Sequence, residues 1–389
     1  MGQQNLFSAS HQWATRPADE RFSTLEDMQN AVNDYKERAT VLDIDMKGLE
    51  AVDKDGDLFI SDKVGHEMQV GHFAFGQLSQ MLGAPPTFLR KLPGDLVRPI
   101  LNYGMNRLAE DEAQTKMLFH RNDDSVLIRA ITSPRYGRIW NCDVLPYLFD
   151  LRDRGWRVPP ARPAIGSQAG SRQATAEDVL NQANFGLSIK VGDWIAPAGL
   201  YASDHDMYAF MVNDQCRIDD GTDEGLARGF FLSNTEVGGA ALKLTKFNYR
   251  FVCGNHIVWD ASDVKEFRIV HRGKNEFNYG NRLVNELRIY GQESAAYEET
   301  RIKEAKNCIL GHDKNSVIET LFKAKVLGKG ALEAIYPIAV QEAEEHGTDP
   351  RSVWGFVQGI TQASQKSDFA DERVELDRAS GKVLLLSKN

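Results

Sequence analysis

The stretch from Phe185 to Ile269 most constrains the fold, because its pattern is that of strands rather than helices. Segments of strand length follow one another there: FGLSIKVGDWIAPAG, MYAFMVN, RGFFLSN, ALKLTKFNYRFVCGN and HIVWDA. Gly238-Gly239 and Gly254-Asn255 supply turns around the fourth of these segments. Helical patterns stand before and after this stretch and do not alternate with its strands. We therefore predict the α+β class, with a central antiparallel β-rich core, helices before it and a mostly helical C-terminal region.

The flanking composition divides the chain into four predicted regions. Residues 1–157 form an N-terminal α+β region, with two short strands around an Asp-Lys-Asp-Gly-Asp turn. Residues 158–176 are rich in Pro, Gly, Ala and Ser, which is typical of a flexible loop or linker, and Thr175 with Asp178 predicts a helix cap after it. The β-rich core covers 177–275. The helical region covers 276–389, with a capping box at Ser316 and Glu319 and a closing strand in RASGKVLLLSKN.

Charge and composition exclude several classes of protein. The chain has 46 Lys and Arg against 55 Asp and Glu, a net charge of -9, so any contact with nucleic acid must be local. The amino end lacks the pattern of a secretory signal, and no stretch approaches the roughly 18 uninterrupted apolar residues of a membrane span. The four cysteines lie far apart without a C-x-x-C pair. We expect a cytoplasmic protein without a membrane contact.

The segment from Glu236 to Trp259 interleaves cations with aromatic residues in a strand pattern. Side chains alternate between the two faces of a strand, so Lys246, Asn248 and Arg250 share one predicted face and Phe247, Tyr249, Phe251 and Cys253 share the other. Leu242 and Leu244 have the parity of the cationic face, which predicts a twist, a bulge or a passage from buried to exposed near Thr245. The segment is either an ordinary half-buried strand with its charged side in water, or one wall of a phosphate-binding groove.

Two basic clusters are candidates for nucleic-acid contacts. The first consists of Lys243, Lys246, Arg250, Arg268, His271, Arg272 and Lys274. It lies in the range from Thr235 to Tyr290, whose nine Lys and Arg exceed its six Asp and Glu by three. The second consists of Arg129, Arg135, Tyr136 and Arg138 around a turn at Ser133-Pro134, where a second strand is predicted to begin. Arginines beside an aromatic ring can clamp a phosphate or stack on a base, but they can equally form salt bridges.

Two alternatives to nucleic-acid binding remain open. Asp204, His205 and Asp206 are typical ligands of a divalent metal and would suit a metal-dependent nuclease, although no H-x-x-x-H or H-x-E pattern accompanies them. The net charge and this acidic run also suit a protein-interaction factor, for instance one that blocks a host defence. Cys253 with His256 invites a thiol–imidazole hypothesis, but their spacing does not ensure contact. Without a nucleophile elbow, a Walker loop or a dinucleotide fingerprint, no catalytic residue, metal ligand or cofactor is assigned.

Four strings stand in order along the chain: FGQLSQMLGAPPTFLRKLP, IRAITSPRYGRIWNCDVL, GLYASDHDMYAFMVN and LSNTEVGGAALKLTKFNYRFVCGNHIVW, followed by FRIVHRG. In this order they resemble the phage- and plasmid-borne proteins grouped as domain of unknown function 932, from about Phe73 to near Gln362. The resemblance implies DNA handling in recombination or replication of mobile elements, and it brings no catalytic residues. The core is also similar in kind to ring-forming single-strand annealing proteins. We therefore expect a nucleic-acid-binding protein with single-stranded DNA as partner, able to form homo-oligomers.

Overall fold

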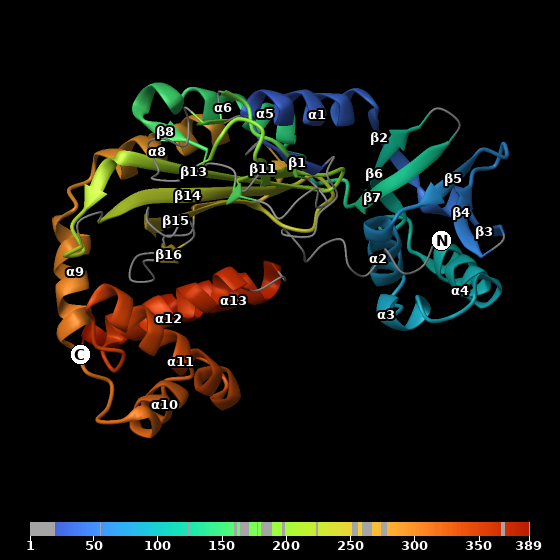
Figure 1. Cartoon of the computed structure of the whole chain (residues 1–389). Helices are drawn as coiled ribbons and strands as arrows, with labels where there is room; N and C mark the ends of the chain where they lie inside the picture. Colours follow the sequence, from blue (N-terminus) through green and yellow to red (C-terminus); the bar gives the residue numbers. More distant parts are fainter. Residues whose placement is uncertain are drawn as a thin grey trace.

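Four of the five segments predicted as strands contribute to the central sheet, and the α+β class is confirmed. In this computed structural model the path β1-β12-β13-β14-β15-β16 forms the sheet, with β17 also on β15 and β8 also on β13 (Figure 1). The structure describes residues 20–388 except 55, 123–124, 159–161, 164–170, 177, 180–188, 197–198, 223–224, 251–255, 259–266, 274–277 and 367–369. All strand pairs of this sheet are antiparallel.

Three long strands form the middle of the central sheet: β13 (Asp206–Ile218), β14 (Leu226–Thr235) and β15 (Leu242–Arg250). Shorter strands flank them: β1 (Arg21–Phe22), β8 (Trp156–Arg157), β12 (Leu200–Ala202), β16 (His256–Val258) and β17 (Phe267–Ile269). Because β1 and β8 come from residues before 158, the predicted N-terminal region also contributes to the central sheet.

Four helices cover one face of the central sheet, which we call the helix-covered face: α1 (Leu25–Glu37), α5 (Asn141–Val144), α6 (Pro146–Phe149) and α8 (Tyr279–Gln292). Figure 1 shows them together along one side of β13, β14 and β15. Their apolar residues share one core with Phe230, Leu242 and Leu244 of the sheet. Thr24 begins α1, where its side chain accepts a hydrogen bond from the backbone N–H of Asp27.

A second sheet occupies the N-terminal region in the order β2-β6-β7-β5-β4-β3. Its strands are β2 (Ala39–Asp45), β3 (Glu50–Lys54), β4 (Asp57–Ser61), β5 (Glu67–Val70), β6 (Gln114–Arg121) and β7 (Val126–Thr132). The hairpin of β3 and β4 confirms the two short strands predicted around the Asp-Lys-Asp-Gly-Asp turn. Helices α2 (His72–Met81), α3 (Pro86–Leu89) and α4 (Gly94–Arg107) share its apolar core.

The predicted linker of residues 158–176 lies partly outside the described residues. Its described parts supply β9 (Arg162–Pro163) and β10 (Arg172–Gln173), which pair with β11 (Trp194–Ala196) in a small third sheet. The cap predicted after it is confirmed, because Thr175 Oγ1 accepts the backbone N–H of Asp178 and the Asp178 carboxylate accepts that of Thr175.

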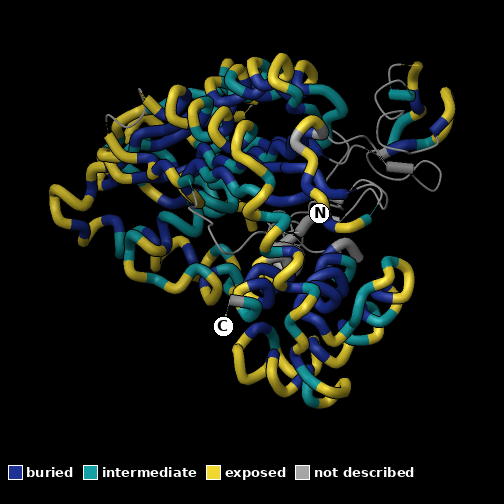
Figure 2. Tube along the Cα trace, turned by 90° about the vertical axis from the view of Figure 1, so that its left-hand side faces the viewer, coloured by how far each residue is buried: buried dark blue, intermediate teal, exposed yellow. Residues whose placement is uncertain are grey.

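The C-terminal helices form a bundle with its own apolar core: α9 (Ala296–Asn307), α10 (Lys314–Lys323), α11 (Lys329–His346), α12 (Val353–Lys366) and α13 (Ala370–Leu385). Figure 2 shows buried residues running through the packed helices and exposed residues along their outer turns. The predicted closing strand is wrong, since Val383 and Leu384 pack in this helical core as part of α13. An apolar run of that length fits either element. The predicted cap is also displaced, because Asp313 caps α10 and Ser316 is its third residue.

Candidate nucleic-acid interface

The two faces of β15 differ from the predicted cationic and aromatic sides. Phe247 is buried and its ring lies 6.4 Å from that of Phe210, as the aromatic side requires. Lys246, however, lies on the helix-covered face, where its Nζ is 2.8 Å from Glu286 of α8 and 4.7 Å from the ring centre of Tyr290. The β14–β15 register is continuous, so no bulge separates Lys246 from the buried Leu244. The prediction that this side faces water is wrong, because α8 covers it.

The face opposite the helices carries a row of polar side chains that crosses the central sheet. Residues directly opposite one another in an antiparallel ladder point to the same face, and the ladder pairs here connect six strands. In order across the sheet the row is Arg21, Tyr201, Tyr208, Ser233, Lys243 and Arg268. We call it the cross-sheet row. Five strand spacings of about 4.8 Å give it a length of roughly 24 Å.

The cross-sheet row is cationic at both ends and contains no carboxylate. Arg268 is exposed, Arg21, Tyr208, Ser233 and Lys243 are half-buried, and Tyr201 is buried. Lys243 is directly opposite Arg268 in the β15–β17 ladder. Two cations therefore stand side by side at this end of the row. Lys243 and Arg268 of the first predicted cluster thus lie together on the face opposite the helices. Lys246 of the same cluster lies on the helix-covered face.

The two predicted clusters meet at the end of β17. The ring of Tyr136 stacks on that of His271 at 5.2 Å with the planes parallel, and the backbone N–H of Gly137 donates to the carbonyl of His271. Tyr136 also forms an isolated bridge with Arg272, which replaces the second strand predicted after Ser133-Pro134. Arg135 and Arg272 are both exposed beside this contact. The meeting point therefore adds two exposed arginines near the Arg268 end of the cross-sheet row.

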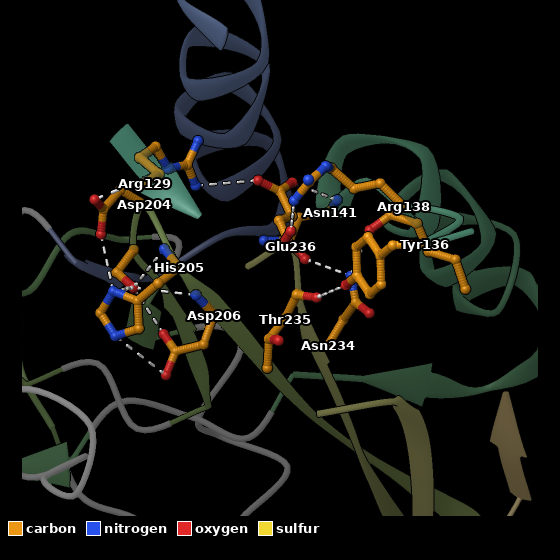
Figure 3. Close-up of polar contacts among 12 residues, drawn as sticks. Arg129, Tyr136, Arg138, Asn141, Asp204, His205, Asp206, Asn234, Thr235 and Glu236 are labelled. Atoms are coloured by element: carbon orange, nitrogen blue, oxygen red, sulfur yellow. Dashed lines mark hydrogen bonds and ion pairs between the residues drawn. The ribbon is translucent and has the colours of Figure 1, made fainter. Parts of the chain in front are cut away.

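Arg129, Arg138 and His271, which the sequence interpretation offered for nucleic-acid contacts, are all buried, and Arg129 forms a salt bridge, the alternative that remained open for these arginines. Figure 3 shows Arg129 and Arg138 on either side of Glu236, which follows β14. Arg129 Nη2 lies 3.2 Å from Glu236 Oε2, and Arg138 Nη1 donates to the carbonyl oxygen of Glu236. Glu236 Oε1 accepts the backbone N–H of Asn141 at 2.8 Å. These contacts join β7 of the second sheet to β14 of the central sheet, so the two arginines hold the sheets together.

Burial changes the ionisation of this junction. Burial, together with the charge of Arg138, lowers the pKa of His271 to about 4, so its imidazole is neutral at pH 7 and accepts the backbone N–H of Ile139 at Nδ1. Burial raises the pKa of Tyr136 to about 12. It also lowers the pKa of Arg138 to about 10, which leaves the guanidinium charged at neutral pH. Neither Tyr136 nor His271 titrates near pH 7.

The acidic residues proposed for a metal site form the turn between β12 and β13. Ser203 Oγ donates to Asp206 Oδ1 at 2.7 Å. His205 Nδ1 lies 2.8 Å from Asp204 Oδ1, and Figure 3 shows these two side chains facing one another. Asp204 also lies 3.9 Å from Arg129. Among the described residues, no group of three or more His, Cys, Asp or Glu side chains has the geometry to hold a metal ion. The carboxylates of this turn instead bind neighbouring polar groups.

Several predicted residues cannot be placed at side-chain level. Lys274, Phe251 and Cys253 lie outside the described residues, and the strands β15 and β16 are described at Arg250 and His256 only as backbone. The sequence interpretation missed Arg21, Tyr201 and Tyr208, whose place in the row depends on strand register. The sequence did contain one signal for the two tyrosines. Tyr201 and Tyr208 stand at equal distances on either side of the turn from Ser203 to Asp206, as directly paired residues of a hairpin do.

Comparisons of the chain with protein-family models, with curated proteins and with solved structures find no match. Within the described part of the chain, none of the helices combines the length and the apolar character needed to cross a membrane.

Proposed function

We propose that this protein binds single-stranded nucleic acid along the cross-sheet row. The observation that carries the proposal is the composition of the row: three cations, two tyrosines and a serine in register on one face, with no carboxylate among them. Lys and Arg side chains neutralise phosphates, and aromatic rings stack on bases whatever their sequence. The row therefore offers both kinds of contact that a single strand needs.

The position of the tyrosines favours a single strand over a duplex. Tyr208 is half-buried in the middle of the row, with Arg21 toward one end and Lys243 and Arg268 toward the other. A base can stack on such a ring only when its flat face is open, whereas in a duplex the faces of the bases are covered by neighbouring base pairs. A row of roughly 24 Å suits the sites of about 4–16 nucleotides found on sheet-based single-strand binders.

We place this binding in the cytoplasm, in recombination or replication of a mobile element. That setting rests on the resemblance to phage- and plasmid-borne proteins in strings such as IRAITSPRYGRIWNCDVL and FRIVHRG. Arg135, Arg268 and Arg272 belong to these same two strings, and all three are exposed. The strings that carry the resemblance therefore include three exposed arginines.

The test is fluorescence anisotropy of a labelled single strand and its duplex with purified protein, across a salt series. Each phosphate contact to a single strand contributes about -0.7 to the slope of log affinity against log salt, so three row cations give about -2, or an approximately 20-fold loss from about 50 to 200 mM salt. Lys243→Glu with Arg268→Glu should reduce the slope to about -0.7 and that loss to roughly threefold. Tyr208→Ala should weaken binding about tenfold or more, while Tyr208→Phe keeps the ring and the affinity.

The matched control is Lys323→Glu with Lys329→Glu, which makes the same charge change at two exposed lysines of α10 and α11. The proposal requires the control to keep the wild-type slope. Equal losses in the two double variants would mean that net charge alone governs binding. If the wild-type protein binds no single-stranded nucleic acid even at low salt, the proposal is refuted.

A further inference from the structure

Helix α4 has two apolar faces, and only one of them packs within the chain. Val97, Leu101 and Met105 are buried in the core of the second sheet. On the other side, Leu96, Ile100 and Tyr103 have exposed fractions of 51%, 39% and 65%. A helix that packs on one side ordinarily presents polar residues on the other, so the second face departs from the usual amphipathic pattern.

The exposed face is continuous along the helix. Leu96, Pro99, Ile100 and Tyr103 follow the spacing i, i+3, i+4 and i+7, which puts all four on one stripe, and Pro99 is exposed like the others. This spacing is the one that an amphipathic helix uses to dock on a partner. Exposed apolar residues scattered singly need no explanation, but four in one stripe mark an interaction surface.

The charges of α4 select the occupant. Asp95 lies in the first turn and Arg107 in the last turn, where the Arg107 guanidinium also donates to the Tyr103 hydroxyl at 2.8 Å. Consider an antiparallel pair of α4 helices related by a twofold axis that passes near Ile100. Measured along the helix, Asp95 of one copy lies roughly 7.5 Å from this axis. Arg107 of the second copy lies roughly 10.5 Å from it, on the same side. The difference of about 3 Å is within the reach of an arginine side chain.

We propose that a second copy of this chain covers the exposed stripe, in an antiparallel α4–α4 dimer. In this arrangement the stripe of one copy packs against the same stripe of the second copy, as a twofold interface requires. Each Asp95 faces the Arg107 end of the other helix, so two equivalent ion pairs form at once. Antiparallel helix dipoles add to the attraction. This inference is independent of the nucleic-acid proposal, because α4 belongs to the second sheet and the cross-sheet row to the central sheet.

Sedimentation velocity of the full chain over a wide range of concentration tests the dimer. Wild type should dimerise, and Ile100→Glu should raise the concentration at half-dimerisation by about 30-fold or more, because it places a carboxylate at the centre of the apolar contact. The control is Phe322→Glu, which changes an exposed aromatic residue of α10 with an exposed fraction of 51% and should leave the dimer intact. A wild-type monomer at every concentration overturns the proposal, as does equal dissociation by the control.

Charge exchange tests the pairing itself, including the case in which Ile100→Glu disturbs folding. Asp95→Arg alone and Arg107→Asp alone should each weaken the dimer about tenfold, since each puts like charges together at both symmetric contacts. The variant carrying both changes should dimerise like wild type. An equal mixture of the two single variants should form a mixed dimer, because both of its contacts again join opposite charges. Failure of both combinations to restore association overturns the antiparallel arrangement.

Discussion

Removal of the Glu236 carboxylate should destabilise the protein more than any exposed charge substitution. The carboxylate lies 3.2 Å from Arg129, whose side chain is 1% exposed, and it accepts the backbone N–H of Asn141. Within the described part of the chain, Arg129 Nε and Nη1 have no hydrogen-bond partner, and Asp204 at 3.9 Å is the other nearby anion. Glu236→Ala therefore leaves a buried guanidinium without close compensation.

The size of the effect follows from that geometry. Loss of one partner from a buried ion pair costs about 3–5 kcal/mol, and the more distant Asp204 places Glu236→Ala near the lower value of about 3 kcal/mol. Glu236→Gln keeps an acceptor for the Asn141 N–H and should cost about 1–3 kcal/mol. Arg129→Met with Glu236→Gln removes both charges, keeps an acceptor for the Asn141 N–H and should lie within about 2 kcal/mol of wild type.

Urea unfolding at pH 7, followed by tryptophan fluorescence and circular dichroism, measures these free energies. The control is Glu286→Ala, which breaks an ion pair with Lys246 whose side chains are 30% and 27% exposed, and should cost at most about 1 kcal/mol. The reasoning requires the double variant to be more stable than Glu236→Ala alone. A loss below about 1 kcal/mol for Glu236→Ala, or strict additivity of the two sites, would show that Arg129 does not depend on Glu236.

Two further predictions concern a buried arginine and a buried histidine. Arg228 donates to the carbonyls of Tyr290, Glu293 and Ser294 and to Glu298, so Arg228→Met should cost about 3 kcal/mol or more in urea unfolding and should raise hydrogen exchange first in α9. His271 has a pKa of about 4 when folded, below its ordinary value, so the unfolded chain binds the extra proton as the pH falls from about 6.5 to about 4. Wild type should lose up to about 3 kcal/mol of stability over that range and none above it, whereas His271→Asn should lose less. Urea midpoints at pH 7 and pH 4.5 decide this, and equal acid sensitivity of both proteins would contradict it.

Local sequence pattern predicted the long strands of the central sheet, because alternation and turn residues act within a few positions. Leu242 and Leu244 were predicted to share one face of their strand, and both pack in the core under the covering helices. Phe247 was predicted on the opposite face and is buried there. The environment of Lys246 was beyond such reasoning. Its partner Glu286 comes forty residues later, on a helix whose docking position no local signal specifies. The pattern therefore predicted the alternation of faces but not what covers each face.

The same limit explains why buried and exposed arginines were predicted alike. Arg129 and Arg135 belong to one short basic segment, yet the first is buried against Glu236 and the second is exposed. The carboxylate that decides this belongs to the chain after β14, more than a hundred residues later. The cross-sheet row likewise depends on register between strands from residue 21 to residue 268. A cation becomes part of an interface or of a core through contacts that only the folded chain brings together.

The net charge of -9 is compatible with the proposed binding surface because electrostatic interactions have a short range in salt. At physiological ionic strength the Debye length is about 8 Å, much less than the roughly 24 Å length of the cross-sheet row. Acidic residues elsewhere on the surface are then largely screened from a strand lying on the row, and Lys243 and Arg268 act on it locally. As salt is lowered, the repulsion from the whole chain extends further and offsets part of the gain in local attraction. Overall charge thus limits how fast a polyanion approaches, while the register of six strands determines where the proposed binding surface lies.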